Sequence, residues 1–428
     1  MTMLPQLKLV SKRIAFGWGV TLERVIGALR LRTHRWLAPV LAWLGVALFN
    51  IVTLAIKGTW DGHAVAMQWW TSVDNVIPEQ TARWILGVQE FIPGLYPFDR
   101  GPLQPILLMW GGEWSTRPVP ALVTGVIINS AWVLGLWALL RALLVSERRI
   151  AFTIFLVGLT GTIWINTIYV WPKMLAAAFC LSCAAFIIRR RPIWAGVLAG
   201  LALLAHGSAL FALIGLVPLA VIRLRWRALW VYGIGALIFS PWYVASLLVT
   251  TTGRPQMIQW HFGGTDVDKP DLRNPILSVL DSYRHVGWAW FDYKLNNFRL
   301  LLGDPTVWVG DAPGWPTEGW PNDDGVGGYA RWLMTGRLLL APGVLLLGLI
   351  RVRRVPRTLL WLCASWAVVF ALMEWGGAAS NSAYIHHAPY ALTIGWTAIC
   401  ALGARWWLAI AQVAVFVGLW LVAPPVWL

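Results

Sequence analysis

Charged residues are scarce in this sequence: Asp, Glu, Lys and Arg make up 12% of its 428 residues, where a soluble domain carries about 25%. Cysteine is scarcer still, with four in the chain. The low charge excludes a soluble enzyme and a disordered tail protein, and the few cysteines exclude a secreted disulfide scaffold. What is abundant is apolar: 58% of the residues are hydrophobic and 32 are Trp, which indicates a polytopic membrane protein.

Apolar stretches long enough to cross about 30 Å of hydrocarbon recur along the chain, bounded by charged residues. They predict an all-α polytopic membrane protein of about eleven transmembrane helices. Two long extracytoplasmic loops, 57–118 and 250–337, are expected to bear helices that lie in the membrane interface. The predicted spans are residues 36–56, 119–144, 150–170, 172–188, 192–206, 208–222, 228–249, 338–350, 357–375, 388–404 and 406–424.

Basic residues fall on alternate connections between these stretches, as the positive-inside rule requires of cytoplasmic loops. They crowd the tail 1–35 and recur at Arg189–Arg191 and Arg351–Arg357, whereas only Glu23 and Glu147 of the 19 acids lie on that side. Membrane orientation therefore accounts for the net charge of +15, and nucleic acid is not an expected partner. Four segments follow from this reading: a cytoplasmic basic tail 1–35, a transmembrane core 36–249 containing the first outer loop, the second outer loop, and C-terminal transmembrane helices 338–428.

The first outer loop contains a helical pattern over residues 79–95. Trp84, Ile85, Val88 and Phe91 share one stripe of a helix there, with polar residues on the other side. This pattern predicts an amphipathic helix lying in the membrane interface. The alternative is an ordinary helix packed on a globular loop.

Polar groups at the membrane boundary are functional candidates, because they are costly to keep at that depth. Asp61 follows the first span in Trp60-Asp61-Gly62-His63, where its carboxylate could act as a general base toward a hydroxyl. The alternative for Asp61 is a helix N-cap. The segment Asp99-Arg100-Gly101-Pro102 closes the first loop as a stiff polar corner.

Lys173 follows Pro172 at the outer start of a span, where proline is favoured and a cation is not. A helix N-terminus suits an anion, so Lys173 is a candidate phosphate ligand, with snorkelling as the alternative. His206 occupies an outer turn, and His386 and His387 precede the next outer entry; each could instead be a satisfied interfacial residue. The predicted topology places all these residues on one membrane face.

The second outer loop gathers basic residues within a short stretch, which suits an anionic or polar ligand; a solvated loop of mixed charge is the alternative. These residues are Arg254, His261, Lys269, Arg273, Arg284, His285 and Lys294. Asp266 and Asp268 in the same loop form a DxD pattern, a weak indication of a divalent metal or a sugar nucleotide.

Taken with these motifs, the chain resembles the GT-C superfamily of polyprenol-dependent glycosyltransferases. The resemblance is best from the first span to about residue 250 and rests on Asp61, the corner Asp99–Gln104, Trp171-Pro172-Lys173 and His206-Gly207. Bacterial inner-membrane proteins of the mannosyltransferase-like and aminoarabinose-transferase-like type look similar in layout. Two departures stand out: Gly62 replaces a second acid found in many relatives, and the Trp-Trp-Asp sequence of peptide-acceptor enzymes is absent.

The resemblance implies sugar transfer at the extracytoplasmic face, from a polyprenyl-phosphate-linked donor to a lipid or glycan acceptor. Asp61 would deprotonate the acceptor, and Lys173 with Arg100 or Arg254 would hold the leaving phosphate. Asp99, His206 and His386 would bind the sugar or orient Asp61. The family includes metal-dependent and metal-independent members; the lack of a compact ligand cluster favours independence, and a divalent cation stays open. The alternatives are an O-antigen ligase-like or polymerase-like enzyme and a lipid or solute transporter.

Overall fold

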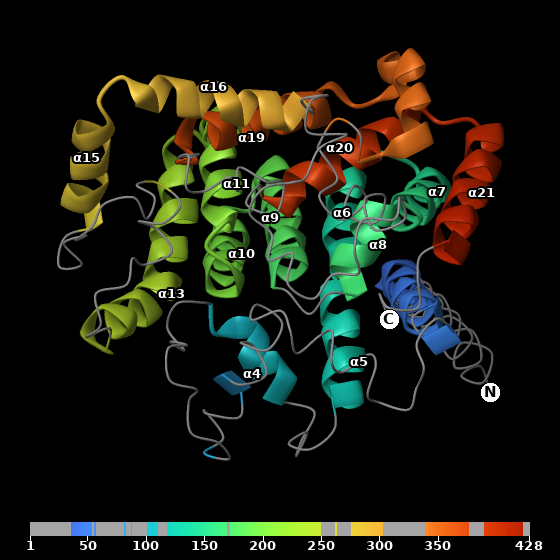
Figure 1. The fold of residues 1–428 in the computed structure, drawn as a ribbon, viewed down its shortest axis with the longest axis horizontal. Helices are drawn as coiled ribbons and strands as arrows, with labels where there is room; N and C mark the ends of the chain where they lie inside the picture. The colour runs from blue at the N-terminus through green and yellow to red at the C-terminus, as the bar shows by residue number, and fades with distance from the viewer. Residues whose placement is uncertain are drawn as a thin grey trace, which may run out of the picture.

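The computed structural model describes residues 36–53, 55–56, 81–82, 87, 101–109, 118–168, 172–249, 262, 275–302, 339, 341–375 and 389–422. Within these residues every regular element is a helix, so the predicted all-α class is confirmed for this part of the chain (Figure 1). After a first helix at Trp36–Thr53, the elements are α4 (Leu103–Met109), α5 (Pro118–Asn129), α6 (Trp132–Ala142), α7 (Glu147–Gly158), α8 (Gly161–Ile168), α9 (Lys173–Ile188), α10 (Pro192–Ala205), α11 (Ala209–Gly215), α12 (Val217–Leu224), η2 (Arg225–Arg227), α13 (Ala228–Val249), α15 (Pro275–Val286), α16 (Ala289–Leu302), η3 (Gly343–Arg354), α19 (Arg357–Met373), α20 (Tyr390–Gly403) and α21 (Trp406–Val422).

Three helical stretches of the described residues are long and apolar enough to cross a membrane. They are Trp36–Thr53, Val123–Ala142 in α5 and α6, and Val217–Ala245 in α12 and α13. The pair α7 and α8 would add a fourth if it counts as one span, although its two halves are bent by 82°. The helices α9, α10, α19, α20 and α21 are apolar but shorter, so the figure of about eleven spans stays a prediction.

Helix ends coincide with sequence signals in most of the predicted spans. Pro192 opens α10 after three arginines, and Pro356 precedes α19, as expected of proline at helix starts. Three predicted spans are instead interrupted, and one of them, 208–222, is divided into α11 and α12. The stretch 150–170 breaks between Gly158 and Gly161, because glycine is a poor helix former, and 338–350 gives way to the 3-10 helix η3.

Helix α9 is the most enclosed element of the bundle, with contacts to α6, α10 and α20. Its sequence is rich in Ala and Cys, small residues that let neighbouring helices approach closely, as they do in membrane proteins. On α6, a Cβ added to Gly135 would lie 2.4 Å from the carbonyl oxygen of Ala178, so the two backbones touch. The tight packing fixes α9, and with it the position of Lys173 at its first turn.

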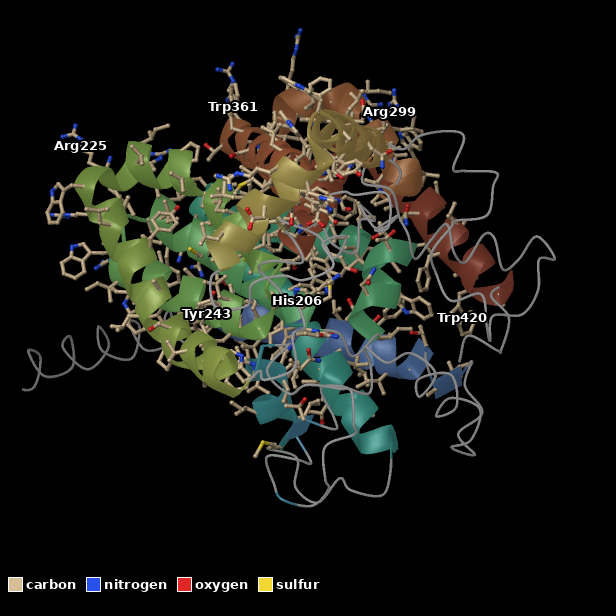
Figure 2. All side chains as sticks on the ribbon, turned by 60° about the vertical axis from the view of Figure 1, so that its left-hand side comes forward. His206, Arg225, Tyr243, Arg299, Trp361 and Trp420 are labelled. Carbon is tan, nitrogen blue, oxygen red and sulfur yellow. The ribbon has the colours of Figure 1, made fainter. Side chains whose placement is uncertain are left out.

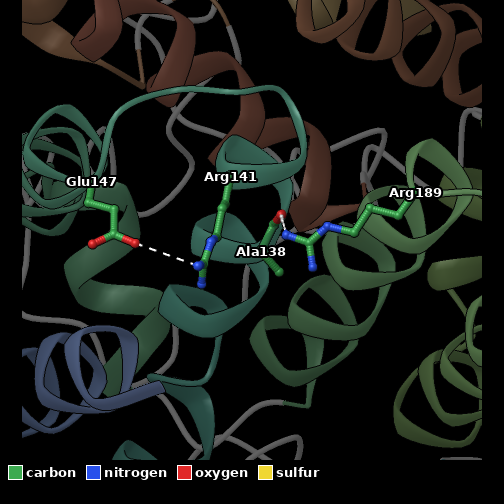
Figure 3. A network of polar contacts seen from close by, with 4 residues as sticks. All are labelled: Ala138, Arg141, Glu147 and Arg189. Carbon is green, nitrogen blue, oxygen red and sulfur yellow. Dashed lines mark hydrogen bonds and ion pairs between the residues drawn. The ribbon is translucent and has the colours of Figure 1, made fainter. Parts of the chain in front are cut away.

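Arginine side chains tie together the connections that carry the basic residues. Arg149 Nη2 donates hydrogen bonds to the carbonyl oxygens of Arg354 at 3.2 Å and Leu402 at 2.5 Å. Nearby, Arg189 Nη2 reaches the Ala138 carbonyl oxygen at 3.5 Å, and Arg141 forms an ion pair with Glu147 at 3.7 Å (Figure 3). The basic connections that follow α6, α9, η3 and α20 therefore meet within the fold. Their assignment to the cytoplasm stays a prediction.

Candidate functional site

Two of the nine predicted site residues, Lys173 and His206, belong to the described part of the chain. The other seven, together with the acids of the DxD pattern, lie outside the described residues: Asp61, Asp99, Arg100, Arg254, His261, His386, His387, Asp266 and Asp268. The amphipathic pattern over 79–95 lies outside them as well, apart from Thr81, Ala82 and Gly87. The site is therefore built from the surroundings of Lys173 and His206.

Lys173 is buried at the first residue of α9, with 2% of its surface exposed. Pro172 precedes it as the N-cap, and the helix is established at once by the hydrogen bond from Ala176 N to Pro172 O at 2.9 Å. Burying an ammonium group is costly, and the positive end of the helix dipole adds to the cost. A site of this kind gains most from binding an anion, since both the charge and the helix end attract one.

Tyr390 at the start of α20 lies against Lys173, whose Nζ is 5.7 Å from the centroid of the ring. The Tyr390 hydroxyl donates a hydrogen bond of 2.6 Å to Asn166 Oδ1 on α8, and Asn166 Nδ2 donates to the Thr162 carbonyl oxygen at 2.8 Å. The ring face stabilises the cation, and the amide fixes the orientation of the ring. The consecutive helices α8 and α9 thus meet the distant helix α20 around this buried ammonium group.

A buried hydroxyl lies one turn beyond Tyr390 on the same side of α20. Thr393 is 1% exposed, and its Oγ1 has no hydrogen-bond partner among the described residues. Buried hydroxyls are ordinarily satisfied by protein or water, so an unsatisfied one suits a polar group of a ligand. Thr393, Tyr390 and Asn166 were not predicted from the sequence as site residues.

His206 ends α10 and is buried, with 2% of its surface exposed; Figure 2 shows it inside the molecule while Arg225 and Trp361 lie at the edge. The Ser208 backbone N–H donates to His206 Nδ1 at 3.1 Å, and the Ser208 hydroxyl lies 2.9 Å from the same nitrogen. Because Nδ1 accepts a backbone hydrogen bond, the neutral ring carries its proton on Nε2. In this geometry His206 offers a donor, which suits orienting a carboxylate or a sugar oxygen rather than acting as a base.

The corner that ends the first outer loop packs directly against the end of α10. A Cβ added to Gly101 would lie 2.0 Å from the carbonyl oxygen of Leu204 and 2.7 Å from that of Ala205. Gly101 follows Arg100, and Ala205 precedes His206, so the structure brings two predicted site segments side by side. The short connection between α9 and α10 makes these helices antiparallel neighbours, which puts Lys173 and His206 at the same end of the pair.

A second buried cation lies where α16 meets the end of α19. Lys294 is 5% exposed, and its Nζ donates to the Glu374 carbonyl oxygen at 2.5 Å. The rings of Tyr283 and Trp375 face it, with centroids 5.2 Å and 5.9 Å from Nζ. Burial lowers the pKa of Lys294 to about 8, and the charge of Glu374 opposes part of that shift. The sequence indicated Lys294 as one basic residue of a loop, but nothing local signals its partners.

The lowered pKa of Lys294 predicts that stability rises with pH between about 8 and 10. In this range the unfolded chain keeps the proton that the folded chain has lost, so the unfolded state binds more protons and stability increases, by about 2–3 kcal/mol. Burial and the charge of Glu374 raise the pKa of Tyr283 to about 12, which reverses the trend only above pH 10. Thermal unfolding of the detergent-solubilised protein at pH 7.5, 8.5 and 9.5 measures the rise.

Two variants control this measurement. Lys294→Met should lack the rise, because it removes the titrating group. Arg299→Met, on the exposed side of the same helix, should keep it. A wild-type curve parallel to that of Lys294→Met would contradict the prediction.

Among the described residues, no group of three or more His, Cys, Asp or Glu could hold a metal ion. No family model, curated protein or solved structure matches the chain. The described site is thus a buried lysine with an aromatic and amide partner at one helix start, and a buried histidine donor at the end of the adjacent helix.

Proposed function

We propose that the protein is a membrane glycosyltransferase that moves a sugar from a polyprenyl-phosphate-linked donor to a lipid or glycan acceptor. The observation that carries the proposal is Lys173, a buried cation at the first turn of α9 with Tyr390 beside it. Both the charge and the helix end favour a phosphate there. The GT-C-like layout, with about eleven spans and the site at the extracytoplasmic face of a bacterial-type inner membrane, belongs to the same proposal.

In the proposed reaction the acceptor oxygen attacks the anomeric carbon while the bond from that carbon to the donor phosphate oxygen breaks. Asp61 takes the acceptor proton as general base. Lys173, with Arg100 and Arg254, stabilises the negative charge that develops on the leaving phosphate. His206 donates a hydrogen bond from Nε2 to orient Asp61 or the sugar, and Asp99, His386 and His387 complete the sugar site.

A transporter is the second candidate, and the bend between α7 and α8 favours it. These helices pass as one apolar span but are bent by 82°, and broken helices commonly line the binding sites of transporters. Asn166, which holds Tyr390, lies on α8 after the break. The break is equally useful to a transferase, since it leaves Asn166 on a short helix where it holds Tyr390, the residue beside Lys173.

The test reconstitutes the full chain in phospholipid vesicles with a panel of short-chain polyprenyl-phosphate sugars that carry a radiolabel in the sugar. Transfer releases polyprenyl phosphate and moves the label to a lipid or glycan product, both visible by thin-layer chromatography. Asp61→Asn should abolish transfer, whereas Asp74→Asn, an acid of the same loop with no assigned role, should retain it. Transfer that survives in Asp61→Asn favours a ligase-like enzyme. Label that crosses the vesicle unchanged favours a transporter.

A further inference from the structure

Helix α16 has two faces of different character. Its inward face carries Lys294 and Asn297, which are 5% and 0% exposed. Its outward face carries Phe291 and Leu295, 59% and 40% exposed, and Trp288 in the preceding turn is 86% exposed. The spacing of Trp288, Phe291 and Leu295 places them on one stripe of the helix, here called the α16 stripe.

The inward face fixes α16 to the bundle by capping α19. Asn297 Nδ2 donates to the carbonyl oxygens of Ala371 at 3.1 Å and Glu374 at 2.8 Å, and Lys294 Nζ donates to the latter. These are carbonyls that the end of a helix leaves without partners, and a cation is favoured there. With two capping side chains engaged in three hydrogen bonds, α16 cannot rotate to bury its stripe against α19.

Helix α19 also exposes apolar residues. Trp361, Val368 and Leu372 are 75%, 45% and 52% exposed and share one stripe of α19. Leu372 lies two residues before Glu374, the residue that α16 caps. Figure 1 shows α16 lying over α19 and running across the upper ends of α11 and α13.

We propose that the α16 stripe rests in a lipid surface, so that α16 is an interfacial helix that the α19 cap holds in the membrane plane. Tryptophan favours the membrane–water interface, where its ring is buried and its N–H remains hydrated. Asp292, one turn after Trp288, and Arg299, one turn after Leu295, are exposed on the same outward face, where their charges keep the helix at the surface of the bilayer. The chain already contains helices able to cross a membrane, so a bilayer lies within reach of this surface.

The size of the stripe argues for lipid over a second copy of the chain. A fully exposed large aromatic residue offers about 250 Å². At their exposed fractions of 86%, 59% and 40%, the three side chains of the stripe together expose no more than about 500 Å². A stable dimer needs about 800 Å² from each partner. A lipid surface has no such threshold, because the spans already hold the protein in the membrane.

The test places a fluorescent NBD label at single introduced cysteines in the full chain. Phe291→Cys and Leu295→Cys report on the stripe, and Asn296→Cys is the matched control, exposed beside Leu295 but off the stripe. The four native cysteines are buried, so labelling is directed to the introduced one. Substitution at exposed positions leaves the fold intact, which gel filtration of each labelled protein verifies.

Quenching in phospholipid vesicles at low protein density gives the result. Spin-labelled lipid should quench the label at 291 and 295 about twofold more than at 296, and aqueous iodide should show the reverse order. Equal access of iodide to all three positions would overturn the proposal. Protection at 291 and 295 that grows with protein density would overturn it in favour of a second copy. None of these readings depends on sugar transfer, so the inference stands or fails apart from the proposed function.

Discussion

Replacing Lys173 by methionine should reduce sugar transfer by about a hundred- to a thousandfold, far more than any accompanying loss of folded protein. The ammonium group is buried, lies at the positive end of α9 and faces Tyr390. Methionine fills a similar volume without the charge, so it keeps the packing of the α9 start and removes the cation. Activity would fall because no cation at this position stabilises the negative charge that develops on the leaving phosphate in the transition state.

Three variants separate this role from simple packing. Lys173→Arg keeps the charge and should retain measurable transfer, although the broader guanidinium fits less well. Tyr390→Phe keeps the ring beside Lys173 and removes the hydrogen bond to Asn166, so transfer should fall less than about tenfold. Polyprenyl phosphate should raise the unfolding temperature of the wild type and not that of Lys173→Met. If Lys173→Met unfolds several degrees earlier and loses activity in proportion, Lys173 is structural.

Helix positions were largely predictable because each apolar run ends at a proline or an arginine cluster. The expected span 172–188 is α9, and 192–206 is α10 to within one residue. The breaks were harder to see. Gly158 and Gly161 weaken the middle of the run 150–170, but a pair of glycines in an apolar stretch is equally compatible with a continuous span. Only the surrounding helices decide between the two.

The site residues, like the helices, were predictable where the signal lies in neighbouring residues and not where it depends on contacts distant in the sequence. Lys173 was identified because proline and a cation at a helix start form a local pattern. Tyr390 and Asn166 could not be, since their hydrogen bond joins positions 224 residues apart. The same holds for Lys294, because the Glu374 carbonyl oxygen that it caps lies 80 residues along the chain.

Gly101→Ala should destabilise the protein by about 1–3 kcal/mol and reduce transfer more than tenfold. The added Cβ would lie 2.0 Å from the Leu204 carbonyl oxygen, and this neighbour is backbone at the end of α10, which cannot swing aside as a side chain would. The corner must therefore move away from α10. The predicted site residues Asp99 and Arg100 precede Gly101 in the sequence, so we expect a displacement of Gly101 to carry over to them.

Gly45→Ala is the matched control, because a Cβ at that position would meet nothing within 4 Å. Alanine is the better helix former, so this variant should be neutral or slightly more stable and fully active. Thermal unfolding and transfer kinetics, measured side by side on both variants, give the comparison. Equal behaviour of the two would contradict the contact between the corner and α10. Partial unfolding would lower kcat, because less of the protein is active, and would leave KM unchanged. A rise in the KM for the lipid donor in folded Gly101→Ala, with Gly45→Ala unchanged, would therefore show that the loss comes from displacement of the donor site.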